Sequence, residues 1–354
     1  MAFTGPGFVD HHTHLLRVAA GVKPPYDYTS PESIAQYHRA LSARGTTPMD
    51  SVGDEIDVER LDAQMMGALE HASSLGLVQL TEAGMHDWAY YDALQRRRED
   101  GRLECRVRVL VGSGLAAEGM RERTGDPDLD LLGVKFYADG WLGPRTCALC
   151  APFSDVHPED DGVLFLEPVV LARRAQRLAE AGWVIATHAI GDRAIEAVLD
   201  AYDMVFGDDP AAVAASGARI EHAQVMSSAL LDRVVDSGVT VCIQPSFSRS
   251  DEETARVALG AERAKRSYDW SGLVGRGGRV ITGADYPIEP LSPLVGLRDL
   301  CVGPEQSRLD VATAFALMTD ASAGTTTLDA DPRELDPDDV ADIADIGVIG
   351  TAPS

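Results

Sequence analysis

Eight short apolar runs, separated by longer amphipathic or irregular segments, restrict the fold of this chain more than any other feature. The runs are rich in Val, Ile and Leu and lie at residues 7–10, 77–81, 107–111, 134–138, 184–187, 219–221, 239–243 and 280–282. Segments with helical periodicity separate several of them, at residues 57–74, 167–181, 194–206, 227–237 and 309–318. Parallel strands buried on both faces have this character, and helices connect them. The pattern predicts an α/β fold, a (β/α)8 TIM-type barrel, with a doubly wound open sheet as the alternative.

The domain organisation follows from the same pattern. We expect the barrel to occupy residues 1–324 and the acidic, Asp/Pro-rich residues 325–354 to form a tail packed on it. Two connections, residues 15–56 and 139–166, are longer than a barrel needs, and loops of such length usually form lids or substrate walls.

The amino-acid composition limits the classes of molecule that this chain can bind. The chain carries 31 basic and 56 acidic residues, a formal charge of −25, which repels nucleic acid and anionic lipid. We therefore expect a small-molecule substrate, no nucleic acid and no membrane, and we allow for a homodimer. Five cysteines, an odd number at low density, and the absence of a leader-like or membrane-spanning segment predict a cytoplasmic protein without disulfides.

Candidate metal ligands stand where four of the apolar runs end. His12 and His14 follow the first run at a spacing that turns both imidazoles the same way, and His188, His222 and Asp285 end the fifth, sixth and eighth runs. Each alone could be a surface or core histidine or a helix-capping aspartate. Because the carboxyl ends of barrel strands form the active face, their recurrence at four strand ends favours one metal site.

Lys135 is the unusual residue of the fourth run. The chain has three lysines, Lys23, Lys135 and Lys265, against 28 arginines, so a lysine within an apolar run needs a reason. Burial would lower its pKa, and a neutral amine can add carbon dioxide to give an anionic carbamate that bridges two cations. The alternative is an ion pair with Asp139 or Glu221.

The chain resembles the amidohydrolase superfamily in six motifs, at residues 12–14, 134–140, 187–194, 220–223, 244–246 and 283–287. It is most similar to the amidohydrolase-3 branch, the YtcJ-like proteins, which include N-substituted formamide deformylases. The resemblance implies one or two zinc ions, or another divalent metal, with Asp285 both ligand and proton shuttle. The implied ligands are His12, His14, carbamylated Lys135, His188, His222 and Asp285.

The chain also departs from this family. The usual accessory β-sandwich is largely missing, and Thr81-Glu82 stands where many relatives have His-Asp or His-Glu. We expect Asp192 to cap the helix after His188. Arg145 could bind the substrate or, equally, form an ion pair within the loops. Cys147 could contact the substrate, but packing in the interior is the main alternative. The predicted substrate-binding residues are Trp141, Arg145, Cys147, Gln244 and Phe247.

These features together predict a metal-dependent hydrolase that cleaves a C–N bond in a small amide, formamide or cyclic amide. Metal-activated hydroxide would attack the carbonyl, with Asp285, His222 and Lys135 as catalytic residues. One alternative is a non-hydrolytic enzyme of the superfamily, a decarboxylase, lyase or cyclase in a specialised pathway. Another is a binding protein without catalysis.

Overall fold

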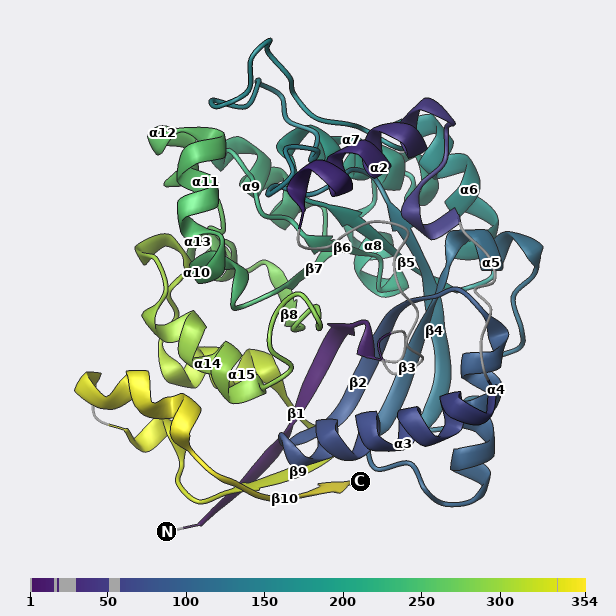
Figure 1. Cartoon of the computed structure of the whole chain (residues 1–354), viewed down its shortest axis with the longest axis vertical. Helices are drawn as coiled ribbons and strands as arrows, with labels where there is room; N and C mark the ends of the chain where they lie inside the picture. Colours follow the sequence, from purple (N-terminus) through teal and green to yellow (C-terminus); the bar gives the residue numbers. More distant parts are fainter. Residues whose placement is uncertain (1, 16–17, 19–29, 51–57, 336) are drawn as a thin grey trace.

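The computed structural model describes residues 2–15, 18, 30–50, 58–335 and 337–354. Its centre is a ten-stranded sheet in the order β10-β9-β1-β2-β3-β4-β5-β6-β7-β8, in which β1 to β8 run parallel (Figure 1). Each of the eight predicted apolar runs coincides with one of these parallel strands, so the TIM-type barrel is confirmed. The strands are β1 (Phe3–Thr13), β2 (Leu77–Met85), β3 (Arg106–Gly112), β4 (Leu129–Tyr137), β5 (Val184–Ala189), β6 (Arg219–His222), β7 (Thr240–Ile243) and β8 (Arg279–Thr282).

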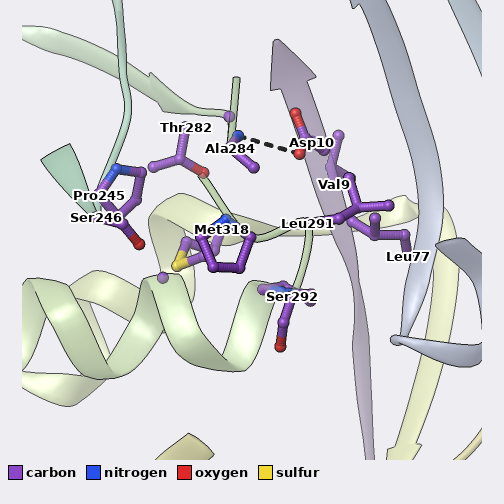
Figure 2. A pocket seen from close by; sticks show the side chains of 14 residues that line it. Val9, Asp10, Leu77, Pro245, Ser246, Thr282, Ala284, Leu291, Ser292 and Met318 are labelled. Carbon is purple, nitrogen blue, oxygen red and sulfur yellow. Dashed lines mark hydrogen bonds between the residues drawn. The ribbon is translucent and has the colours of Figure 1, made fainter. Parts of the chain in front are cut away.

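Among the described residues, no β-ladder pairs β1 with β8, and single hydrogen bonds close the barrel between these two strands. At this seam Asp285 N donates to His12 O at 2.7 Å, and His14 N donates to Tyr286 O at 2.9 Å. The buried Asp10 carboxylate also accepts from His12 N at 2.8 Å and from Ala284 N at 3.1 Å, the latter across the seam (Figure 2). A Cβ on Gly283 would lie 2.4 Å from His12 N, so glycine is what lets the two backbones approach.

Helices surround the sheet (Figure 1). The five predicted helices are confirmed as α3 (Val58–Ser74), α6 (Pro168–Glu180), α7 (Asp192–Phe206), α9 (Ser228–Asp236) and α15 (Val311–Met318). The others are α2 (Pro31–Ala43), α4 (Trp88–Glu99), α5 (Ser113–Glu118), α8 (Pro210–Ser216), α10 (Phe247–Ser250), α11 (Glu252–Leu259), α12 (Ala261–Ala264), α13 (Trp270–Gly275) and α14 (Pro293–Val302).

Two helix starts bear on the loops above the barrel. The prediction that Asp192 caps α7 is wrong, because the N-cap is Gly191 and Asp192 is the first helical residue. Its carboxylate instead accepts from Cys150 N at 2.7 Å and so anchors the loop after β4. Helix α2, capped by Ser30, lies within the long connection 15–56; residues 16–17, 19–29 and 51–56 of that connection are outside the described residues.

The C-terminal residues extend the sheet rather than forming only a tail. Strand β9 (Thr319–Leu328) pairs antiparallel with β1, and β10 (Val348–Pro353) pairs antiparallel with β9. Residue 324, the predicted boundary, lies inside β9; the division into two units stays a prediction. Of the helices in the described part of the chain, none has the length and apolar character to cross a membrane.

Candidate active site

The six predicted metal ligands come together at the carboxyl ends of the strands. His12 Nε2 and His14 Nε2 each lie 3.4 Å from Asp285 Oδ1, and Lys135 Nζ lies 3.4 Å from His12 Nε2. The His222 ring is centred 5.0 Å from the ring of His12 and 4.5 Å from that of His188. Side chains from β1 and the residue after it, from β4, β5 and β6, and from the segment after β8 therefore form one cluster, which we call the strand-end cluster.

Backbone geometry helps to aim two members of this cluster. His222 has a φ of 80° and Asp285 a φ of 57°, both in the left-handed region that favours glycine. Such conformations cost of order 1–3 kcal/mol each and persist where the surroundings hold them. Here Ala223 N donates to Ala189 O at 2.9 Å and Asp285 N donates to His12 O, so the neighbouring strands fix both turns.

Hydrogen bonds leave a nitrogen lone pair on each buried histidine. His12 Nδ1 donates to Glu221 Oε2 at 2.6 Å, and His222 Nδ1 donates to Gln244 Oε1 at 2.7 Å, so Nε2 of each ring is unprotonated when the ring is neutral. His188 Nε2 donates to Gly140 O at 3.0 Å, and its buried Nδ1 has no hydrogen-bond partner. An orphaned buried nitrogen beside two further imidazoles and a carboxylate fits a divalent metal ion.

Burial is the largest influence on the pKa values of the titratable groups in the strand-end cluster. Burial lowers the pKa of His12 and His222 well below its usual value, and nearby cationic groups add to this effect. Burial also raises the pKa of Asp285 to about 6. Neutral imidazoles and a carboxyl group that titrates near neutrality are suited to metal binding and proton transfer.

Lys135 is fully buried, and burial lowers the pKa of its amine. Neither ion pair that the sequence left as an alternative is observed among the described residues. Asp139 instead accepts backbone N–H groups, from Ala148 at 2.9 Å and Ile190 at 3.0 Å among others. This environment suits a neutral amine, and carbamylation of Lys135 remains a prediction.

Sequence reasoning did not assign a site role to Arg219 and Glu221 of β6. Arg219 Nε lies 2.6 Å from Glu221 Oε1, at ion-pair distance but not aligned for a hydrogen bond, and both side chains are buried. Burial opposes the charge on Glu221, yet Arg219, His12 and Lys135 hold its pKa well below the usual value. Two charged residues at alternate positions of an apolar strand were the available signal.

Glu82 is also part of the site. It lies in β2 opposite Thr13 of β1, it is buried, and its Oε1 is 3.8 Å from His14 Nδ1. The position that departs from the family pattern therefore still places a carboxylate beside the strand-end cluster.

A cavity of about 400 Å³ lies over the cluster, lined by His188, His222 and Asp285. Trp141 and Phe247 line it as well, together with Ile34 of α2. The structure thus brings two of the five predicted substrate-binding residues to the cavity wall.

The other three have different positions. Gln244 accepts a hydrogen bond from His222 Nδ1 and does not belong to the described lining of the cavity. Arg145 pairs with Asp155 through Nη2 and Oδ2 at 2.7 Å, and Cys147 is fully buried; neither belongs to the described lining of the cavity. In this structure Arg145 therefore forms an ion pair within the loops, and Cys147 packs in the interior. For both residues this is the alternative to substrate contact that the sequence left open.

Comparison with known proteins identifies relatives. Residues 41–344 match the model of a family described as the amidohydrolase family. The chain is 29% identical over 283 residues to the putative amidohydrolase YtcJ of Bacillus subtilis (strain 168), covering 75% of this chain and 52% of that protein. It is 28% identical over 229 residues to the protein LONG AFTER FAR-RED 3 of Arabidopsis thaliana, covering 60% of this chain and 38% of that one. The chain therefore spans about half or less of the length of these curated relatives.

Solved structures share the fold. One described as an uncharacterized metal-dependent hydrolase from Pyrococcus horikoshii OT3 superposes with a TM-score of 0.74 at 22% identity, covering 95% of this chain and 88% of that one. A protein of the same description from Pyrococcus furiosus gives a TM-score of 0.71 at 20% identity, covering 99% of this chain and 85% of that one.

Proposed function

The chain belongs to the amidohydrolase family, and on this premise we propose that it is a metal-dependent hydrolase cleaving a C–N bond in a small amide, formamide or cyclic amide. The observation that carries the proposal is the strand-end cluster on the floor of a cavity of about 400 Å³. The charge of −25 supports a small molecule rather than a polynucleotide as the partner. All five cysteines are unpaired, which supports the cytoplasm as the compartment.

We propose zinc, or a similar divalent ion, as the cofactor. Imidazole nitrogens with one carboxylate are ligands that zinc accepts, and ligand atoms of His12, His14 and Asp285 lie within 4.8 Å of one another. His188 and His222 would complete the set. A carbamate on Lys135 would add an anionic oxygen ligand to this set. A bound divalent ion would lower the pKa of a water molecule and polarise the substrate carbonyl.

The residues of the chain would then carry the proton transfers. Asp285 lies on the cavity floor, 3.4 Å from both His12 Nε2 and His14 Nε2, where its carboxylate can take the proton of the attacking water. The same group would return that proton to the departing nitrogen, so that one water molecule is added across the C–N bond. His222, fixed by Gln244, would steady the carbonyl oxygen. Trp141 and Phe247 would hold the apolar part of the substrate and exclude solvent.

Metal analysis together with Asp285→Asn tests this proposal. We expect purified protein to contain stoichiometric divalent metal, chelation to abolish hydrolysis of amide and formamide substrates, and Asp285→Asn to keep the fold while losing about 10²–10⁴-fold in activity. Asp100→Asn, at the exposed end of α4, is the matched control and should behave as wild type. Full activity of metal-free protein, or of Asp285→Asn, would contradict the proposal.

A further inference from the structure

The cavity has a second polar region besides the strand-end cluster. Asp251, at the start of α11, and Gln224, shortly after β6, line the same cavity as His188, His222 and Asp285. Neither residue belongs to the proposed catalytic group. A polar region within an otherwise largely apolar wall is the usual device by which a pocket orients its ligand.

Tyr268 fixes the positions of both side chains. Its buried Oη donates to Asp251 Oδ2 at 2.8 Å and lies 3.3 Å from one end of the Gln224 side-chain amide. One phenolic proton cannot serve two oxygens, and the shorter distance assigns it to Asp251. Since the two ends of an amide are exchangeable by a half turn, we assign the Gln224 nitrogen to the contact with Tyr268 Oη, where it donates.

This assignment places the Gln224 oxygen at the end of the amide away from Tyr268. The Gln224 residue is 2% exposed, and the amide end away from Tyr268 has no hydrogen-bond partner among the described residues. Because Gln224 lines the cavity, this oxygen is available to a hydrogen-bond donor of a ligand there. Gln224 and Asp251 then present two oxygens to the same space.

Asp251 has no cation in direct contact among the described residues, although the Tyr268 hydroxyl donates to it. No Lys or Arg in the described part of the chain lies within 4 Å of its carboxylate, and none of the described cavity residues is Lys or Arg; Arg145, which pairs with Asp155, lowers the pKa of Asp251 only from a greater distance. Glu289 adds a second negative charge nearby; burial raises the pKa of both Asp251 and Glu289, and the nearby Asp251 raises that of Glu289 further. A partly buried carboxylate without a cationic partner is costly, and a cation supplied by the ligand would offset that cost.

We propose that Asp251 and Gln224 bind a cationic nitrogen of the substrate, such as an ammonium or amidinium group, through their two side-chain oxygens. The apolar body of the substrate would lie between Trp141 and Phe247, whose ring faces also favour a cation. This assignment of a substrate class rests on the proposed function, because it places the cationic end away from the bond that is cleaved. The binding itself can be measured without turnover.

Benzamidinium and acetophenone are the probes, because they have the same shape and number of heavy atoms but differ in charge. We expect calorimetry on the metal-loaded full chain to show benzamidinium bound about tenfold more tightly than acetophenone, as a charge-assisted contact predicts. Asp251→Asn should weaken benzamidinium about tenfold and leave acetophenone within about twofold. Gln224→Met should weaken benzamidinium by a smaller factor.

Glu253→Gln is the control for general surface charge, since it removes the same charge from α11 at an exposed position and should not change either affinity. Equal binding of the two probes to wild type would overturn the inference even if Asp251→Asn failed to fold. A preference for the cation that persists in Asp251→Asn would overturn it too.

The outcomes separate this inference from the proposed function. Cation preference without hydrolysis of any amide would remove the proposed function and leave Asp251 as part of a binding site. Hydrolysis that depends on metal and Asp285, without cation preference, would remove only the inference.

Discussion

Replacing Glu221 by Gln tests the buried charges beneath the strand-end cluster. Glu221 is 0% exposed and Arg219 is 4% exposed, so removing the carboxylate charge leaves Arg219 as a buried cation. Breaking a buried pair in this way typically costs 3–5 kcal/mol. Arg219 keeps one partner, because its Nη2 donates to His11 O at 3.1 Å. We therefore expect the free energy of unfolding to fall by about 3 kcal/mol, the lower end of that range.

Reversible urea unfolding of metal-depleted protein measures this change without the contribution of bound metal. The double variant Arg219→Met/Glu221→Gln removes both charges and should recover about 2 kcal/mol relative to the single variant. Glu180→Gln, an exposed change on α6, is the control and should stay within about 0.5 kcal/mol of wild type. A loss below about 1 kcal/mol for Glu221→Gln, or no recovery in the double variant, would refute the reasoning.

The metal site should respond to the same change. Glu221 accepts the Nδ1–H of His12 and so fixes both the tautomer and the ring orientation. Loss of such a supporting partner usually costs 10–100-fold in metal affinity. Zinc titration of Glu221→Gln against wild type should show a reduction of about this size. Unchanged affinity would mean that Glu221 does not orient His12.

Two further predictions concern pH and the barrel seam. Burial lowers the pKa of His38 from 6.5 to about 3, so the unfolded chain takes up a proton first, and stability falls as the pH drops from 6.5 toward 3. Between pH 7 and pH 5 wild type should lose about 2 kcal/mol more than His38→Gln in urea unfolding; equal losses would show that His38 is not the source. Gly283→Ala should destabilise the protein by about 1–3 kcal/mol because its Cβ would meet His12 N at 2.4 Å. Gly275→Ala, with open space around it in α13, should be neutral or slightly stabilising. Urea unfolding of the two variants measures the difference, and an equal effect of both changes would contradict the argument.

The barrel and the strand-end cluster could be predicted from sequence because both follow from local patterns. A strand buried on both faces needs a continuous apolar run, and in a barrel the residue that ends the run stands on the active face. His188 and His222 are recognisable for that reason. Strand β9 was missed because it contains Thr, Ala and Gly rather than an apolar run, and its pairing with β1 decides its conformation.

The parts of the site that escaped sequence reasoning depend on contacts between distant residues. The supporting role of Glu221 exists only because β1 places His12 beside it, 209 positions away in the chain. Arg145 has a φ of 59° and turns to Asp155, an orientation that no local pattern encodes. Asp251 is a candidate ligand-binding residue because it lines the cavity and accepts a hydrogen bond from Tyr268. The residues next to it in the sequence indicate neither contact.

The seam between β1 and β8 has a consequence for how the barrel moves. His12 and His14 lie on the β1 side of this seam, and Asp285 lies on the β8 side. A metal ion bound by all three side chains would cross-link the two edges of the barrel where no β-ladder joins them. Loading the centre should then slow amide hydrogen exchange most in the segments on either side of this join.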